Sequence, residues 1–155
     1  MKNILLAADH AGYNLKRTLV SHLQSLQLPY EDLGTHSAES VDYPDFARNL
    51  IGRMSGEHAG ILICGTGIGM AIAANRFPGI RCAVAVTPEM ARLARLHNNA
   101  NVLALGSRLI DQATAIQIVE TFLNTAYEGG RHDRRLIKLD MVGFDAGAAP
   151  LRSMG

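Results

Sequence analysis

The chain has 155 residues, of which 15 are Lys or Arg and 14 are Asp or Glu, so its formal net charge is +1. A charge this close to zero, with no Trp and 5% aromatic residues, argues against nucleic acid or an anionic membrane as partner. The 48% apolar content argues against disorder, no apolar run reaches the roughly 18 residues of a membrane span, and the N-terminus lacks a signal-peptide pattern. Since the two cysteines have neither metal nor redox spacing, we expect a cytoplasmic domain that acts on a small molecule.

Short apolar runs alternate with longer stretches of helical periodicity along the chain. Runs such as NILLAA and GILIC are typical of strands buried on both faces of a sheet. The longer stretches place apolar residues on one side of a helix. In chain order, the pattern predicts strand 3–8, helix 12–27, strand 30–33, helix 42–54, strand 60–64, helix 70–76, strand 80–86, helix 89–98, strand 101–105, helix 111–126 and helix 131–141.

This alternation predicts one α/β domain, residues 1–142. Its five-stranded parallel sheet would be covered by helices on both faces, as a three-layer α/β/α sandwich. Segment 143–155 is rich in Gly, Ala and Pro without periodicity, so we expect a C-terminal tail that is loosely ordered or packed on a neighbour. Because ligands of such sheets bind beyond the carboxyl ends of the strands, the residues that follow each strand are the candidates for a site.

A glycine-rich loop directly follows the predicted strand 60–64. Gly65, Gly67 and Gly69 permit a tight turn, and its N–H groups can converge on an anion at the start of the next helix. That anion would be a phosphate or an oxyanion formed during a reaction. The dinucleotide fingerprint is not matched, because Met70 stands where its third glycine should be. A plain strand-to-helix turn is the alternative interpretation.

Two cysteines lie in or at the end of predicted strands. Cys64 immediately precedes the glycine loop, where a thiol beside a helix N-terminus can act as a base or a nucleophile. The alternative for Cys64 is a small buried core residue, which is the usual fate of a free cysteine. Cys82 lies inside a strand, so we interpret it as part of the core.

Other ionisable residues stand at predicted boundaries. Asp9 and His10 follow the first strand, and they are either ligand contacts at the sheet edge or ordinary turn residues. Asp42 precedes Pro44 in a typical helix start, which favours a capping role for the carboxylate. His97 ends a helix, where an imidazole is favourable to the helix dipole but can also donate and accept protons near neutral pH.

An arginine-rich segment, GGRHDRR, opens the last predicted helix. Arg131 and Arg135 are four residues apart and share a helix face, in opening turns where the dipole disfavours cations. Glu128 or Asp133 could compensate this charge, but a bound phosphate would do so better, with Arg108 as a further ligand. No His, Cys, Asp or Glu cluster has convincing metal-ligand spacing, so we expect no metal and no cofactor.

Together these parts suit proton transfer next to the carbonyl of a phosphorylated sugar. The same combination closely resembles the ribose-5-phosphate isomerase B family, which includes allose- and galactose-6-phosphate isomerases. The resemblance rests on AADHAG at 7–12, DYP at 42–44, GILICGTGIGMAIAANRFPGIR at 60–81, HNNANVLALGSR at 97–108 and YEGGRHDRR at 127–135. It implies a Rossmann-like homodimer or homotetramer with active sites at the subunit interface. The implied reaction interconverts aldose and ketose phosphates through a cis-enediolate, without a metal.

The resemblance also implies catalytic roles. Cys64 matches the base that moves a proton between C1 and C2, and Thr66 would orient the substrate or the thiolate. His97 would open the sugar ring, and Asn98 would contact hydroxyl groups. Asp42 would shuttle protons between the two substrate oxygens.

Further positions would bind the substrate. Asp9 would contact hydroxyls or the ring oxygen, and Tyr43 would line the pocket. The enediolate would be held by backbone N–H groups of the loop, namely those of Gly65, Thr66, Gly67, Ile68, Gly69 and Met70. The phosphate would be held by His10, Arg108, Arg131 and Arg135. Since the family's sites form between subunits, some of these residues would come from the partner chain.

One residue departs from the family pattern: Asn99 stands where an aspartate is common. Ribose 5-phosphate is the leading substrate, and erythrulose 4-phosphate and six-carbon sugar phosphates (allose or galactose 6-phosphate) are alternatives within the same chemistry. Two further alternatives are a non-catalytic sugar-phosphate or nucleotide-binding module, and a subunit that needs a different partner chain. The presence of Cys64, His97 and both arginines in one chain favours a self-sufficient homo-oligomer.

Overall fold

The computed structural model of the chain describes residues 3–142, so the predicted tail 143–155 lies outside the described residues. Strands and helices alternate as the sequence pattern predicts. In chain order they are β1 (Asn3–Ala8), α1 (Tyr13–Ser25), β2 (Tyr30–Asp32), α2 (Tyr43–Arg53), β3 (His58–Cys64), α3 (Ile68–Ala74), β4 (Cys82–Val84), α4 (Pro88–Asn98), β5 (Val102–Gly106), α5 (Gln112–Asn124), the 3₁₀ turn η1 (Gly130–His132) and α6 (Asp133–Met141). None of the described helices is long and apolar enough to cross a membrane.

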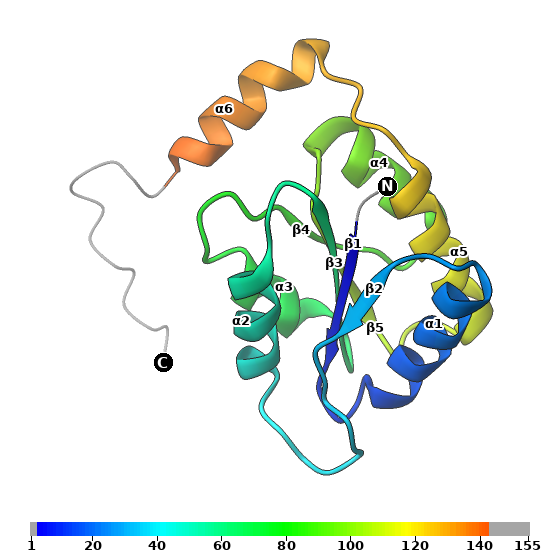
Figure 1. The fold of residues 1–155 in the computed structure, drawn as a ribbon. Coiled ribbons are helices and arrows are strands. Elements are labelled where there is room, and N and C mark those ends of the chain that lie inside the picture. Colours follow the sequence, from blue (N-terminus) through cyan, green and yellow to red (C-terminus); the bar gives the residue numbers. More distant parts are fainter. Residues whose placement is uncertain (1–2, 143–155) are drawn as a thin grey trace.

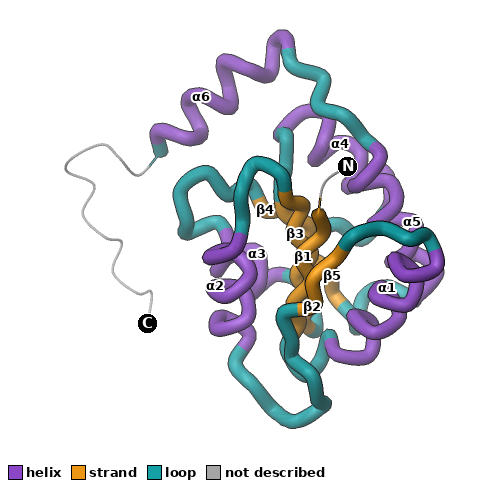
Figure 2. Tube along the Cα trace, in the orientation of Figure 1, coloured by secondary structure: helices purple, strands orange, loops and turns teal. Residues whose placement is uncertain are grey.

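The strands form one parallel five-stranded sheet in the order β2-β1-β3-β5-β4. Helices α2 and α3 cover one face, while α1, α4 and α5 cover the other (Figure 1). Connections at both ends of the sheet are loops and turns (Figure 2). The predicted three-layer α/β/α sandwich is therefore confirmed.

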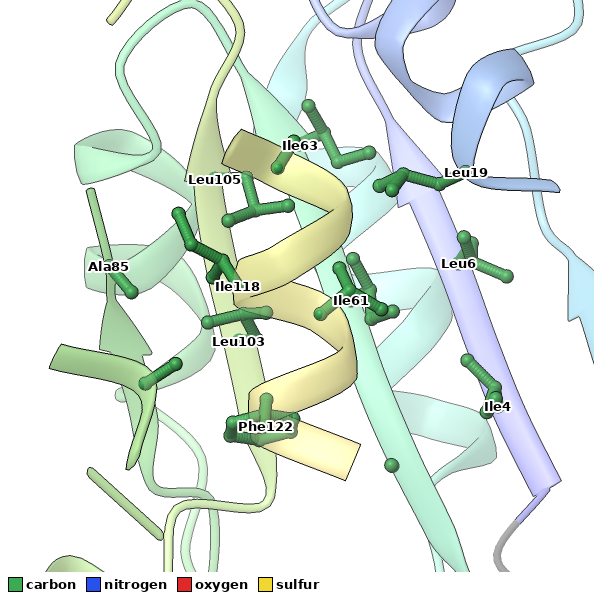
Figure 3. Packing of buried hydrophobic residues seen from close by; sticks show 14 of the residues in the cluster. Ile4, Leu6, Leu19, Ile61, Ile63, Ala85, Leu103, Leu105, Ile118 and Phe122 are labelled. Atoms are coloured by element: carbon green, nitrogen blue, oxygen red, sulfur yellow. The ribbon is translucent and has the colours of Figure 1, made fainter. Parts of the chain in front are cut away.

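Alternation along the strands decides which layer each side chain enters. In β1, Ile4 and Leu6 belong to the core beneath α1 and α5, while Leu5 points to the core beneath α2 and α3. Figure 3 shows Ile118 of α5 lying over the sheet within the first of these cores. Both faces being covered explains why the strands read as continuous apolar runs.

Most elements differ from the sequence prediction by one or two residues at an end, and the differences in β4 and α3 have a structural reason. Strand β4 spans Cys82–Val84 instead of 80–86, because it is an edge strand that pairs with β5 alone within the described sheet. Helix α3 begins at Ile68, two residues before the predicted start. Its N-cap is Gly67 with φ of 77°, and this left-handed turn lets the helix begin inside the glycine loop.

The end of α4 is fastened by a buried arginine. Arg95 is 9% exposed, and it donates hydrogen bonds to the Thr125 carbonyl (3.2 Å) and to Oδ1 of Asn99 (3.0 Å). Burial lowers the pKa of the Arg95 guanidinium. Asn99 adopts φ of 45°, a left-handed conformation that asparagine tolerates well after a helix. The segment that follows α5 is thereby held against the last turn of α4.

Helix α6 stands away from the sheet (Figure 1). Of its residues, Leu136 alone is buried, while Ile137 is 63% exposed and Leu139 is 49% exposed. An Arg81–Asp140 ion pair of 3.3 Å connects the helix to the region before β4. An amphipathic helix with its apolar residues uncovered indicates a surface that another chain could cover.

Candidate active site

A cavity of about 250 Å³ lies at the carboxyl edge of the sheet. Its walls come from the segments that follow β1, β3 and β5 and from the start of α2, as expected for a parallel α/β sheet. The lining residues are Asp9, His10, Ala11, Tyr43, Cys64, Gly65, Thr66, Gly69 and Arg108. The structure therefore brings together eight of the residues singled out from the sequence.

Cys64 is the last residue of β3 and lies at the base of this cavity. It is 5% exposed, and its Sγ accepts a hydrogen bond from the Gly67 N–H at 3.1 Å. The Gly67 N–H points at the sulfur because the chain turns through a left-handed conformation at this residue. The sulfur is thus held in place by the glycine loop, where it can take a proton from a substrate carbon.

The rest of the loop presents open backbone donors. The N–H groups of Gly69 and Met70 have no hydrogen-bond partner among residues 3–142, as expected in the first turn of a helix. The Met70 side chain is fully buried in the core beneath α2 and α3, so its backbone is the part available to a ligand. Ile68 donates its N–H to Thr66 Oγ1 at 3.3 Å, which occupies that donor.

Two side chains lie directly on glycines of the loop. A Cβ placed on Gly65 would come within 2.8 Å of Nη1 of Arg108, and one on Gly69 within 2.7 Å of Cζ of Tyr43. Both distances are below van der Waals contact, so larger residues there would displace the cavity walls. Close packing requires glycine at both positions whether the loop is a plain turn or an anion site.

Asp9 and His10 are held by backbone contacts. Asp9 is 6% exposed, and its Oδ1 accepts the Gly12 N–H at 3.0 Å. His10 Nδ1 lies 3.2 Å from the Val41 nitrogen and 3.3 Å from the Val41 carbonyl oxygen, so the backbone of Val41 holds the ring in place. Asp42 follows Val41 as the exposed N-cap of α2, without a side-chain capping bond and outside the cavity lining. The helix start predicted at Asp42 is confirmed, but its capping hydrogen bond is absent.

A second group of predicted residues lies at the opposite edge of the sheet. Helix α4 begins after β4 at the carboxyl edge and runs back, so His97 in its last turn lies at the amino edge. The His97 ring stacks on that of His132, with centroids 4.5 Å apart and planes 18° apart. Glu128 Oε2 lies 3.9 Å from Nε2 of His97 and 3.5 Å from Nε2 of His132. Arg131 Nε lies 3.4 Å from the same His132 nitrogen.

Two further predicted residues belong to this edge. Asn98 lines a separate cavity of about 600 Å³, together with Arg81 and Asp140. Arg135 is exposed in the first turns of α6. The expectation that Arg108, Arg131 and Arg135 converge on one phosphate is therefore not met within one chain, because α4, α5 and the chain after α5 carry the last two away from Arg108.

The stacked histidines and Glu128 have ligand atoms within 4.8 Å of one another, a spacing that metal sites also show. Histidine ligands must point their nitrogen lone pairs at one ion. These lone pairs lie in ring planes that are nearly parallel, so they do not converge. Sequence reasoning did not single out His132, although a histidine flanked by charged residues in GGRHDRR was a visible signal.

Comparison with known proteins identifies the family. The model of the ribose/galactose isomerase family matches residues 4–139. The ribose-5-phosphate isomerase B of Escherichia coli is 46% identical over 138 residues, which cover 88% of this chain and 93% of that protein. The crystal structure of the Thermotoga maritima ribose 5-phosphate isomerase has a TM-score of 0.89 and 50% identity, covering 91% of this chain and 99% of that one.

A structure with a bound sugar is also similar. The Mycoplasma genitalium ribose-5-phosphate isomerase B, solved with bound ribulose-5-phosphate, has a TM-score of 0.88 and 42% identity, covering 92% of this chain and 97% of that one. The match runs through both groups of site residues, since it extends from β1 into α6. The chain therefore belongs to the ribose/galactose isomerase family, as an isomerase of the ribose-5-phosphate isomerase B type.

Proposed function

We propose that this isomerase interconverts ribose 5-phosphate and ribulose 5-phosphate through a cis-enediolate, without a metal, in a single domain of residues 1–142. The observation that carries this proposal is Cys64, seated beside open N–H groups in a cavity at the carboxyl edge. The relative with bound ribulose-5-phosphate supports the five-carbon sugar over four- and six-carbon alternatives. Both cysteines are free thiols, in keeping with the cytoplasm, where we expect the protein to act.

The chemistry begins with the open-chain aldose in the cavity. The Cys64 thiolate takes the proton from C2, and the electron pair moves to form the C1–C2 double bond with negative charge on O1. The N–H groups of Gly69 and Met70 hold that charge, because they have no other partner in the described chain. The O2 proton passes to O1, and Cys64 returns its proton to C1. The family resemblance assigns the O2-to-O1 transfer to Asp42, which adjoins the cavity-lining Tyr43 but lies outside the lining itself. The product is the ketose, with every proton accounted for.

His97, Asn98, Arg131 and Arg135 would reach this cavity from a second copy of the chain. We place the ring-opening His97 and the phosphate-binding arginines of one protomer at the Cys64 cavity of the other, in a homodimer. The separation of the two groups at opposite edges of one sheet supports this arrangement. His10 and Arg108, beside Cys64, would complete the phosphate site.

Exposed apolar side chains supply a surface for the second copy. On α3, Ile68 is 54% exposed and Ile72 is 55% exposed, and α6 adds Ile137 and Leu139. Ile68 and Ile72 belong to the helix that begins in the glycine loop of the Cys64 cavity, whereas Ile137 and Leu139 follow the arginine segment on α6. Burying them between two copies would join the two halves of the site while removing apolar area from water.

Substitutions of the two cysteines, made one at a time, test the proposed function. Cys64→Ala should abolish isomerisation of ribose 5-phosphate while binding of the sugar phosphate is retained. Cys82→Ala is the matched control, because burial raises the pKa of that thiol to about 12 and it contacts no part of the cavity. Measuring kcat/KM on four-, five- and six-carbon sugar phosphates with the wild type identifies the substrate. Wild-type turnover by the Cys64→Ala protein would remove the assigned base.

Mixed dimers test the sharing of sites. Cys64→Ala and His97→Ala proteins should each be inactive alone, but a mixed dimer would contain one site that has both an intact Cys64 and an intact His97. Random mixing makes half of the dimers mixed, each with one of two sites active, so about a quarter of wild-type activity should return. If Cys64 and His97 of the same chain worked together, mixing would restore none.

A further inference from the structure

We propose that His132 is a positioning residue that holds the His97 imidazole for opening of the furanose ring. This inference rests on the proposed function, and it assigns a role to a side chain that the reaction scheme above leaves unused. The proposal stands on three contacts at the amino edge: the ring stack, the carboxylate of Glu128 that faces both rings, and the backbone bond that fixes the position of Glu128.

The two histidines differ in burial. His132 is 4% exposed, whereas the side chain of His97 is 37% exposed on the last turn of α4. Their rings are stacked, with centroids 4.5 Å apart and an interplanar angle of 18°. One flat face of His97 therefore lies against a buried ring, while its other side is open to a substrate. A half-exposed side chain without such a support would distribute over several rotamers.

The support is itself fixed by the backbone around it. Two consecutive glycines have positive φ, Gly129 at 71° and Gly130 at 61°, directly before His132, whose ring stacks on His97 of α4. The N–H of His132 donates to the Gly129 carbonyl at 3.2 Å, and the Glu128 N–H donates to the Leu96 carbonyl at 3.1 Å. The backbone of Glu128 is thus tied to the residue that precedes His97.

The arrangement suits a proton transfer that demands exact placement. Ring opening needs an imidazole nitrogen within hydrogen-bond reach of the sugar, about 2.6–3.2 Å between heavy atoms. A misplacement of about 1 Å can cost about 100-fold in rate. Glu128 Oε2 lies 3.9 Å from His97 Nε2, which is beyond hydrogen-bond distance, so that nitrogen stays available to the sugar.

A cyclic and an open-chain substrate distinguish loss of His97 positioning from a general loss of folded enzyme. Ribose 5-phosphate exists mainly as a furanose and must be opened, whereas ribulose 5-phosphate cannot close a furanose because O5 carries the phosphate. We therefore compare two rates for each variant: turnover of ribose 5-phosphate, and deuterium incorporation from D₂O at C1 of ribulose 5-phosphate, followed by NMR. Affinity for ribitol 5-phosphate, an open-chain probe, is measured by calorimetry.

Three variants at one position and one control complete the experiment. His132→Ala and His132→Asn remove the flat ring, and each should lower kcat on ribose 5-phosphate by about 10- to 100-fold. Their deuterium incorporation, measured at saturating ribulose 5-phosphate, should stay within about two-fold of wild type. The ribitol 5-phosphate affinity reports separately the loss of the contact between His132 and Arg131 (3.4 Å), which concerns phosphate binding and not ring opening. His132→Phe keeps a flat ring and should restore kcat to within about five-fold of wild type. His22→Ala is the matched control, because His22 also pairs with a glutamate (Glu120, 2.9 Å) but stacks on no catalytic ring.

Each outcome decides the proposal. A fall in kcat confined to the cyclic sugar and reversed by His132→Phe supports positioning. Equal falls on both sugars, unchanged turnover in His132→Ala, or a His132→Phe protein as slow as His132→Asn would each overturn it. If His132→Ala does not fold, His132→Asn and His132→Phe still give the comparison. A wild-type protein that processes neither pentose phosphate would instead overturn the proposed function, and the role of His132 with it.

Discussion

Replacing Gly67 by alanine should destabilise the protein and disturb the site together. Gly67 has φ of 77°, and left-handed backbone costs a residue with a Cβ about 1–2 kcal/mol. The added Cβ would also lie 3.0 Å from the carbonyl carbon and 3.2 Å from the carbonyl oxygen of Leu105. Leu105 belongs to β5, which has a strand on each side, so its backbone has little room to move.

The expected loss follows from these two costs. Conformational strain contributes about 1 kcal/mol after the smaller unfolded-state entropy of alanine is included. Overpacking against β5 adds about 1–2 kcal/mol. The free energy of unfolding should therefore fall by about 2–3 kcal/mol, equivalent to a decrease in Tm of about 4–12 °C at this chain length. Displacement of the Gly67 N–H from Cys64 Sγ should lower kcat as well.

Gly79→Ala is the matched control for backbone strain. Gly79 has φ of 76°, nearly that of Gly67, but a Cβ there meets nothing within 4 Å. Its unfolding free energy should fall by about 1 kcal/mol with kcat unchanged. Urea unfolding followed by circular dichroism measures both variants, and the ketose absorbance measures turnover. Equal stability of the two variants, with wild-type kcat in Gly67→Ala, would refute the assigned packing of the loop on β5.

Two further predictions concern charges in the scaffold. Lys16 is 1% exposed and pairs with Asp32, which is 26% exposed and also accepts the Gly34 N–H at 2.9 Å. Asp32→Asn leaves a buried ammonium without its carboxylate, so its free energy of unfolding in urea should fall by about 3–5 kcal/mol. Lys16→Met removes the buried charge itself and should lose about 1–3 kcal/mol. The reverse order of the two losses would contradict the pairing. Asn99→Asp should stabilise the fold by about 0.5–1 kcal/mol at neutral pH, because it gives the buried Arg95 a carboxylate in place of an amide. That carboxyl would have a folded pKa below its unfolded value of about 3.9, so the gain is present above that pH and disappears as the pH falls through the folded pKa; a gain that persists in acid would exclude the ion pair.

Local pattern was sufficient to predict much of the molecule. The alternation of apolar runs with amphipathic stretches predicts the parallel sheet, because a strand buried on both faces and a one-sided helix have different apolar periods. Thr87 accepts the Met90 N–H at 3.2 Å, as its position before Pro88 predicts. Strand direction alone places residues at or just after the end of a strand, such as Cys64 and Asp9, at the carboxyl edge.

The boundaries of β4 and α3 depended on tertiary structure. Apolar residues at 80–86 suit a strand, but an edge position with one neighbour limits the ladder to Cys82–Val84. The start of α3 depended on a positive φ at Gly67, which glycine allows without requiring it. The apolar pattern indicates neither which strands pair with β4 nor that Gly67 adopts a left-handed backbone conformation.

Which site residues lie together was also decided by the tertiary structure. The sequence predicts that Arg108, Arg131 and Arg135 bind one phosphate, and the family resemblance implies that some site residues come from a partner chain, without saying which. The structure sends α4 back across the sheet, so His97 and Arg131 end at the edge opposite to Cys64. The kinds of residue in the site could thus be predicted from the sequence, because acids, bases and phosphate ligands are recognised by side-chain type alone. Its division into two halves, and the stack of His132 on His97, are consequences of helix direction and packing that only the folded chain determines.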